Sequence, residues 1–239
     1  MVNFGDDMIV NARQGNIYYW DESVGTGTAA VALSDITRRA VNLTSNPITT
    51  TSGGTVITIL DKAGHGASVG DTVTIAGAAA TGGITAVRLN VEMTIASVPT
   101  NATSTATGGG SVNATYSAGT YYTPIAAHQV MISDVARHVI CFGCNNIGET
   151  EINPLLVRWS SSEAAGAWQP LSTNSAGGQE ISSGSEIIGA MATRQETLIW
   201  TDNGIVSMRY IGSPFYFSFT ETAKGMSMVS PDAAVNAGG

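Results

Sequence analysis

TLIWTDNGIVSMRYIG, residues 197–212, places two apolar runs on either side of the dipeptide Asn203-Gly204. Both runs contain the β-branched and aromatic residues that favour strands. Asn-Gly between such runs is the strongest short-range hairpin signal, because a type I′ turn needs positive φ at both of its central residues. The stretch therefore predicts an antiparallel hairpin with a type I′ turn at Asn203 and Gly204.

The same pattern continues along the chain in both directions. Apolar runs of strand length, separated by turn residues, lie at residues 138–142, 155–160, 168–171, 186–192 and 215–219. Near the N-terminus, Met8-Ile9-Val10 and Ile17-Tyr18-Tyr19-Trp20-Asp21 flank a turn, which predicts a further hairpin. Its aromatic end matches the surroundings of Trp200 in kind, so we expect repeated four-stranded antiparallel units of the kind that form propeller blades.

Residues 44–118 differ from the rest in composition, because they are rich in Thr, Ala and Gly and contain no Trp. Strand signals recur in them at residues 56–60, 72–76, 91–98 and 112–116. Short strands at near-regular spacing predict a small β-sandwich or barrel, here inserted into the surrounding fold.

The expected fold is all-β. Propeller-like antiparallel blades occupy residues 1–43 and 119–239, and the inserted module at residues 44–118 interrupts them. Long surface insertions change loop-closure entropy little, so deleting residues 46–117 should leave a folded remainder. The length outside the insert suits about three blades, whereas a closed propeller has at least four. The units therefore belong to a longer protein, close with parts from elsewhere, or form an open stack.

Charge is scarce and mainly acidic. Charged residues make up 12% of the 239, and 10 basic against 18 acidic residues give a net charge of −8. Binding nucleic acid without regard to sequence requires Lys and Arg to neutralise phosphates, and this chain cannot supply a broad basic face. No apolar stretch approaches 18 residues and the N-terminus is acidic, so we expect neither membrane insertion nor a secretory signal.

Two short motifs match known signatures without the context that those signatures need. Gly66-Ala67-Ser68-Val69-Gly70 matches the nucleophile elbow of hydrolases, which requires a helix after the Ser, whereas a strand pattern follows here. Gly25-Thr26-Gly27-Thr28-Ala29-Ala30 faintly matches a dinucleotide-binding loop, but no strand–helix–strand pattern surrounds it. We interpret both motifs as loops.

Cys141 and Cys144 form a C-x-x-C pair, with His138 three residues before the first Cys. A zinc site needs four ligands, and no second pair of Cys or His lies at a ligand spacing. A redox pair begins a helix, whereas Cys141 lies in an apolar strand pattern, and a haem site would need His where Asn145 stands. We interpret both cysteines as small buried strand residues.

We interpret the remaining candidate carboxylates and sequons as surface residues, and the tryptophans as core residues. Adjacent carboxylates on loops are usually solvated, N-x-T sequons mean little without a signal peptide, and aromatic rings at strand spacing usually pack in a core. The carboxylates are Asp6, Asp7, Asp21, Glu22, Glu149 and Glu151, the sequons begin at Asn42, Asn101 and Asn113, and the expected core tryptophans are Trp159, Trp168 and Trp200. The sequence thus predicts no catalytic residue, no cofactor and no metal site, and a protein that is not an enzyme.

Stretches that combine aromatic and turn residues lie on both sides of the insert, at residues 11–21, 154–160 with 168–170, 187–190 with 198–204, and 208–215. Together they resemble the tail nozzle and packaged-DNA-stabilising tail proteins of podovirus-type bacteriophages. The resemblance implies a propeller-containing ring, usually sixfold, at the distal end of a short tail through which DNA leaves. It implies no catalytic residues.

The expected function is therefore that of a structural component of a phage tail, a nozzle or adaptor ring that forms part of the DNA-exit conduit. A receptor- or glycan-binding tail protein is the alternative, and its mark would be an exposed aromatic cluster on loops. A hydrolase would instead show a carboxylate pair or a Ser–His pair in a cleft. The expected location is the tail of the virion, after synthesis in the host cytoplasm.

Partners follow from the same features. Short strands and charge-poor faces leave sheet edges exposed, and packing against further copies covers them. We expect a homo-oligomeric ring, a hexamer if the resemblance holds, joined to neighbouring tail, adaptor and fibre proteins. Genome DNA would pass through the lumen without specific binding, because an acidic wall repels phosphates within about a Debye length of 10 Å.

Overall fold

The structure, a computed structural model, describes residues 1–36, 38–43, 46–50, 55–60, 67–98, 108–110, 112–117, 121–231 and 233–235. The chain divides into two compact units. The inserted unit is residues 37–121, and the stacked unit joins residues 1–36 to residues 122–239. The stacked unit is therefore discontinuous in sequence.

The described part of the stacked unit contains three runs of four consecutive strands, which we call the first, middle and third meanders. The first is β1 (Val2–Phe4), β2 (Asp7–Asn11), β3 (Gly15–Trp20) and β4 (Val31–Ala32); the middle is β11 (Ala126–Ile132), β12 (Val139–Asn145), β13 (Ile152–Trp159) and β14 (Gly177–Glu180); the third is β15 (Ile187–Ala192), β16 (Thr197–Thr201), β17 (Gly204–Gly212) and β18 (Tyr216–Lys224). Neighbouring strands within each meander pair antiparallel. Two residue pairs between β3 and β11 join the first and middle meanders into one sheet.

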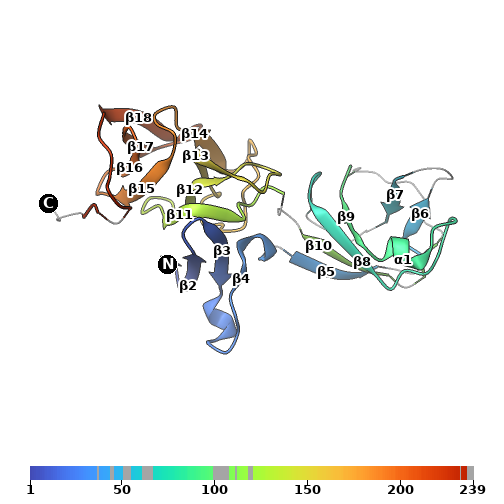
Figure 1. The fold of residues 1–239 in the computed structure, drawn as a ribbon. Coiled ribbons are helices and arrows are strands. Elements are labelled where there is room, and N and C mark those ends of the chain that lie inside the picture. The colour runs from blue at the N-terminus through green and yellow to red at the C-terminus, as the bar shows by residue number, and fades with distance from the viewer. Residues whose placement is uncertain are drawn as a thin grey trace. The chain divides into compact units, whose positions relative to one another are not determined.

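Two hydrophobic cores hold the meanders together, one on each face of the middle meander. Figure 1 shows the middle meander between the first and the third. The first core joins the first and middle meanders through Ile9, Ile17, Leu33, Ala127, Val130, Val139, Cys141, Cys144, Leu156, Ala165 and Trp168. The second core joins the middle and third meanders through Ile140, Phe142, Val157, Trp159, Ile181, Ile187, Ala190, Ile199, Val206, Met208 and Phe217. All seven residues of β12 are buried, because its alternate side chains serve both cores.

A β-bulge at Gly143 changes the side-chain alternation of β12. The register with β13 shifts between Phe142 and Cys144, and Gly143 has φ +57°. The extra residue places Cys144 in the same core as Cys141, although strict alternation over three positions would put them on opposite faces. A Cβ on Gly143 would lie 3.1 Å from Cβ of His128, so both the backbone angle and the space favour Gly here.

The hairpin predicted at residues 197–212 is confirmed, but its turn is not of type I′. Neither Asn203 nor Gly204 has a positive φ. Instead the buried Thr201 hydroxyl accepts hydrogen bonds from the amides of Asn203 (3.3 Å) and Gly204 (3.0 Å). Glycine is needed for a different reason, since a Cβ on Gly204 would lie 2.6 Å from the carbonyl oxygen of Ala223.

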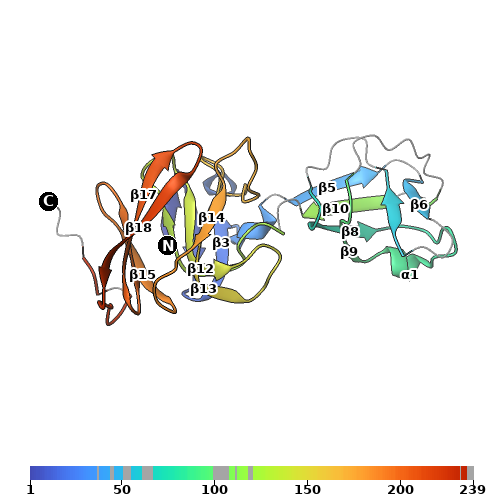
Figure 2. The same ribbon diagram turned by 90° about the horizontal axis from the view of Figure 1, so that it is seen from above.

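The inserted unit has a core of its own, and Figure 2 shows its strands β5, β10, β8 and β9 side by side. Its described elements are β5 (Arg38–Leu43), β6 (Ile48–Thr50), β7 (Ile57–Ile59), β8 (Thr72–Ala76), α1 (Ala86–Leu89), β9 (Glu92–Thr94) and β10 (Val112–Ser117). An antiparallel sheet of order β5-β10-β8-β9 and the β6–β7 pair contribute to this core, through residues such as Leu43, Ile48 and Ile75. Neither a closed barrel nor a closed propeller is found in the described residues of either unit.

Several finer predictions differ from the structure. Residues 38–43 were expected in the first blade segment, but β5 pairs along its whole length with β10 and so belongs to the inserted unit. Residues 168–171 form no strand, and the strand expected at residues 91–98 covers only β9. Trp20 ends the third strand of its meander whereas Trp200 lies in the second strand of its own, so the two do not occupy equivalent positions in a repeat.

The separate cores predict that the stacked unit folds without the insert. We expect a chain with residues 37–121 replaced by a short Gly-Ser linker to unfold cooperatively in urea, because Ile36 and Tyr122 both pack against the first core. Circular dichroism measures the transition. Deleting only residues 46–117 is the matched comparison, and it should give a less soluble chain because β5 loses β10. A linker variant without a cooperative transition would contradict the division into units.

The buried tryptophans should contribute strongly to stability. Trp159 and Trp168 are 5% and 1% exposed, and the indole N–H groups donate to the carbonyl oxygens of Ser175 and Ala165. Replacing either by Ala should lower the unfolding free energy by about 3–5 kcal/mol. Trp200→Ala is the control with a smaller expected loss, since Trp200 is only half-buried. Urea unfolding measures the unfolding free energy of all three variants. Equal losses of unfolding free energy would show that burial of the Trp side chain does not determine the size of the loss.

Candidate functional site

The two cysteines lie in the first core and are fully buried free thiols. The Cys144 thiol contacts the carbonyl oxygens of Cys141 at 3.8 Å and of Leu156 at 3.7 Å. Burial raises the pKa of Cys141 well above its ordinary value and raises that of Cys144 to about 12. Because the thiolate is the reactive form, these residues pack as small apolar side chains, as the sequence predicted.

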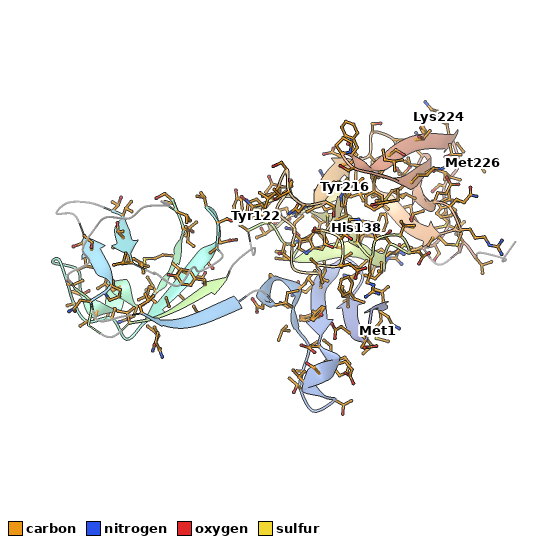
Figure 3. The ribbon with its side chains drawn as sticks, turned by 180° about the vertical axis from the view of Figure 1, so that it is seen from behind. Met1, Tyr122, His138, Tyr216, Lys224 and Met226 are labelled. Carbon is orange, nitrogen blue, oxygen red and sulfur yellow. The ribbon has the colours of Figure 1, made fainter. Side chains whose placement is uncertain are left out.

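His138 precedes β12 and is also fully buried (Figure 3). Its Nδ1 lies 2.7 Å from the carbonyl oxygen of Ser160, so Nδ1 carries the proton. Nε2 has no hydrogen-bond partner among the residues that the structure describes. The ring lies among the rings of Tyr210, Tyr216 and Phe217, with centroid distances of 5.9, 6.3 and 5.3 Å. Burial lowers the pKa of His138, so this histidine is a neutral packing residue between the middle and third meanders.

Arg158 is a buried cation that no sequence motif indicates. It is 3% exposed, and its guanidinium donates to the carbonyl oxygens of Asn145, at 3.1 Å, and Tyr122. Its Cζ also lies 6.0 Å from the centroid of the Trp168 ring. Burial lowers the pKa of Arg158. Arg158 therefore joins β13 to the end of β12 and to the start of the segment that follows the insert.

The hydrolase-like motif forms a loop in its described part. Gly66 lies outside the described residues, and Ser68 comes just before the strand β8, so no helix follows it. The buried Asp71 accepts hydrogen bonds from the amides of Ser68 at 2.8 Å and Tyr121 at 3.1 Å. Residues 67–70 thus form a loop before β8, which agrees with the interpretation of the motif as a loop.

The N-terminal acidic residues hold turns in place. Asp7 accepts from the Tyr19 hydroxyl and, at 3.0 Å, from the amide of Glu22. Burial, followed by this hydrogen bond, raises the pKa of Tyr19. Asp21 accepts from the amide of Ser23 at 2.9 Å and so caps a short 3₁₀ turn.

The other singled-out residues are spread over the surface. The glycine-rich stretch at residues 25–30 is a loop, and Glu149 and Glu151 are exposed. The sequon residues Asn42 and Asn113 are exposed and directly opposite each other on β5 and β10, while Asn101 lies outside the described residues.

One cleft in the stacked unit is rich in aromatic side chains. Its volume is about 470 Å³, and it lies between the segment 171–179 and the turn from β17 to β18. The aromatic rings that line it belong to Trp159, Phe215, Tyr216, Phe217 and Phe219, and Phe215 is 74% exposed. Ser172, Asn174, Gln179 and Ser213 supply the polar part of the lining.

The outer faces of the first and third meanders form two further candidate surfaces. We call them the N-terminal end face (Met8, Val10, Tyr18 and Trp20) and the C-terminal end face (Met191, Leu198, Trp200 and Ile205). On each strand these side chains alternate with core residues, and cross-strand pairs such as Met8 with Trp20 and Trp200 with Ile205 place them on one side. They are only partly buried, and Tyr18 is 38% exposed.

Polar side chains of the middle and first meanders close the outer edge of β15. The Gln129 amide donates to the carbonyl oxygen of Ala190 and accepts from its amide, both at 2.8 Å. Arg13 donates to the carbonyl oxygen of Ile188 at 3.1 Å and, through Nε, to Nε2 of His128 at 3.1 Å. Nε2 of His128 also lies 3.1 Å from the carbonyl oxygen of Ile188. Burial and the Arg13 charge lower the pKa of His128, which favours its neutral form.

Comparison of the chain with protein-family models, with curated proteins and with solved structures finds no match. Among the described residues, no group of three or more His, Cys, Asp or Glu side chains is placed to hold a metal ion. No helix in the same residues has the length and apolar character to cross a membrane.

The raised thiol pKa values predict that both cysteines resist modification. At pH 8 the native chain should not react with a thiol reagent such as 5,5′-dithiobis(2-nitrobenzoate), whereas the guanidinium-unfolded chain should release two equivalents of chromophore. Thr222→Cys, at an exposed position of β18, is the control that should react at once. Rapid native labelling of Cys141 or Cys144 would show that the first core opens readily.

The lowered histidine pKa values predict a loss of stability in mild acid. The unfolded chain binds protons at the ordinary value of about 6.5, whereas folded His128 and His138 bind them only at lower pH. The unfolding free energy should therefore fall as pH drops from 7 to 5, by at most about 1.4 kcal/mol per pH unit for each histidine. Urea unfolding of a His128→Gln, His138→Gln double variant should show a much flatter profile.

Three carboxylates with lowered pKa values affect the unfolding free energy at lower pH than the two histidines do. The pKa values of Glu196, Asp202 and Glu221 are lowered by hydrogen bonds, so their contribution is lost only below about pH 4.5. An unchanged slope between pH 7 and 5 in the double variant would contradict the assignment to these two histidines.

Proposed function

We propose that the chain is a structural subunit of a bacteriophage tail, part of a nozzle or adaptor ring around the DNA-exit conduit, and not an enzyme. The proposed location is the tail of the virion. The partners are further copies of the chain, six in all if the resemblance holds, and neighbouring tail, adaptor and fibre proteins.

The observation that carries this proposal is the stacking of three four-stranded antiparallel meanders through two cores. The resemblance to tail nozzle proteins implies blades of this kind. The stretches that carry it include β3, β13 and β15 to β17, so they contribute strands to all three meanders. A described chain with three such units leaves apolar faces at both ends, and a ring supplies neighbours for them.

Charge supports the passage of DNA without retention. The net charge is −8, and most cations described in the stacked unit already have partners. Arg13 binds His128, Arg158 is buried, Arg137 and Arg209 pair with Glu163 and Glu196, and Lys224 pairs with Glu221. Phosphate binding needs available Lys and Arg, so we expect an acidic and small-polar lumen.

Three measurements test the conduit. Analytical ultracentrifugation of the full chain should show a defined oligomer, and cryo-electron microscopy of virions that contain the chain should place it in the tail. Duplex DNA should show no retention in a gel-shift assay at 0.15 M salt. A chain that stays monomeric at high concentration and in virions, or a micromolar salt-dependent affinity for duplex DNA, would contradict the proposal.

The aromatic cleft favours a second candidate, a glycan-binding tail protein. Its exposed Phe215 and its hydroxyl- and amide-bearing rim match the pattern of sites in which rings contact sugar faces. Titration with a panel of neutral oligosaccharides, followed by Trp fluorescence, should show saturable binding that Phe215→Ala removes. Equal oligosaccharide binding by the wild type and Phe215→Ala, or no binding by the wild type, would contradict a glycan-binding role of the cleft.

A further inference from the structure

The two end faces carry the same kind of side chain as the buried cores. Each combines a Trp with aliphatic or sulfur-containing side chains, and each belongs to strands whose other face is already packed, β2 and β3 in the first meander and β15 to β17 in the third. Exposed apolar groups that gather on one face of a sheet mark interaction surfaces. In the described part of the C-terminal segment, Met228 and Pro231 lie over Gly189, which pairs with Trp200 at the edge of the C-terminal end face, and a Cβ on Gly189 would come within 3.0 Å of Met228 Cε.

We propose that the N-terminal end face of one copy packs on the C-terminal end face of a second copy, so that copies stack head to tail. This rests on the proposed self-assembly and specifies its interface. Within one chain, the first meander already packs on the middle one and the middle one on the third through apolar sheet faces. The same contact between copies extends the series and buries both end faces.

Charge disfavours packing between two N-terminal end faces. Residues 1–36 contain five acidic residues and one basic residue, a net charge of −4, whereas residues 187–224 contain three of each and are neutral. Two N-terminal end faces would bring two strongly acidic meanders together, and like-charge juxtaposition disfavours association. Packing of unlike faces avoids that repulsion. Such a heterologous contact closes into a ring or continues as a filament, depending on the rotation between copies.

A mixing experiment tests this interface with two variants of the full chain. Tyr18→Arg blocks the N-terminal end face and Leu198→Arg blocks the C-terminal end face, because each puts an exposed charge into a dry apolar contact. Met191→Arg is the second variant of the C-terminal end face in case Leu198→Arg does not fold by circular dichroism. Val135→Arg is the matched control, since Val135 is 53% exposed in the turn between β11 and β12.

Sedimentation equilibrium gives the masses. We expect the wild type and Val135→Arg to associate. Each blocked variant alone should be monomeric, with association weakened at least about 100-fold. An equimolar mixture of the two blocked variants should form a 1:1 dimer and nothing larger. In that mixture each chain retains one intact face, so only a single head-to-tail contact is possible. A mixture that stays monomeric, a blocked variant that still reaches the wild-type mass, or a monomeric wild type would overturn the proposal.

The same data separate this interface from the proposed function. A 1:1 dimer in the mixture, together with DNA binding or absence from virion tails, would retain the head-to-tail contact and remove the conduit. A tail ring whose mass is unchanged by both blocking variants would retain the conduit and remove this contact.

Discussion

The burial of β12 on both faces is the constraint on which the rest of the stacked unit depends. Its alternate side chains, such as Val139 and Ile140, belong to different cores, so the first and third meanders are both anchored to one strand. A strand covered on both faces has no access to water for its backbone groups, and β11 and β13 pair with it on either edge. The middle meander is thus the framework, and each neighbour adds one layer.

Polar side chains at the margins of the cores also connect neighbouring segments, because each forms its hydrogen bonds with another segment rather than with its own strand. Gln129 of β11 pairs with both backbone groups of Ala190, and Arg158 of β13 donates to Asn145 and Tyr122. The pairing with Ala190 has a second effect, since it occupies the outer edge of β15 and prevents strand addition there.

The sequence predicts local structure well and long-range structure poorly. The hairpins at Asn203-Gly204 and after Val10 follow from alternation and turn residues, which are local signals. Strand β14 was missed because its residues, Gly177–Glu180, have low strand propensity and pair only because β13 lies beside them. The limit of the insert was missed for a similar reason, since β10, the partner of β5, lies far along the chain. The end faces were missed because alternation shows two faces without showing which one is covered.

The discontinuity of the stacked unit has a consequence for synthesis on the ribosome. Residues of the first meander, such as Ile17, leave the ribosome roughly a hundred residues before Val130, with which they share a core. At about 5–20 residues per second this separation is a delay on the order of ten seconds. During that time the inserted unit, which is continuous in sequence, can complete its own core while the first meander has no partner. Residues 1–36 contain five acidic residues and one basic residue, so two such waiting segments on neighbouring ribosomes repel each other rather than associate.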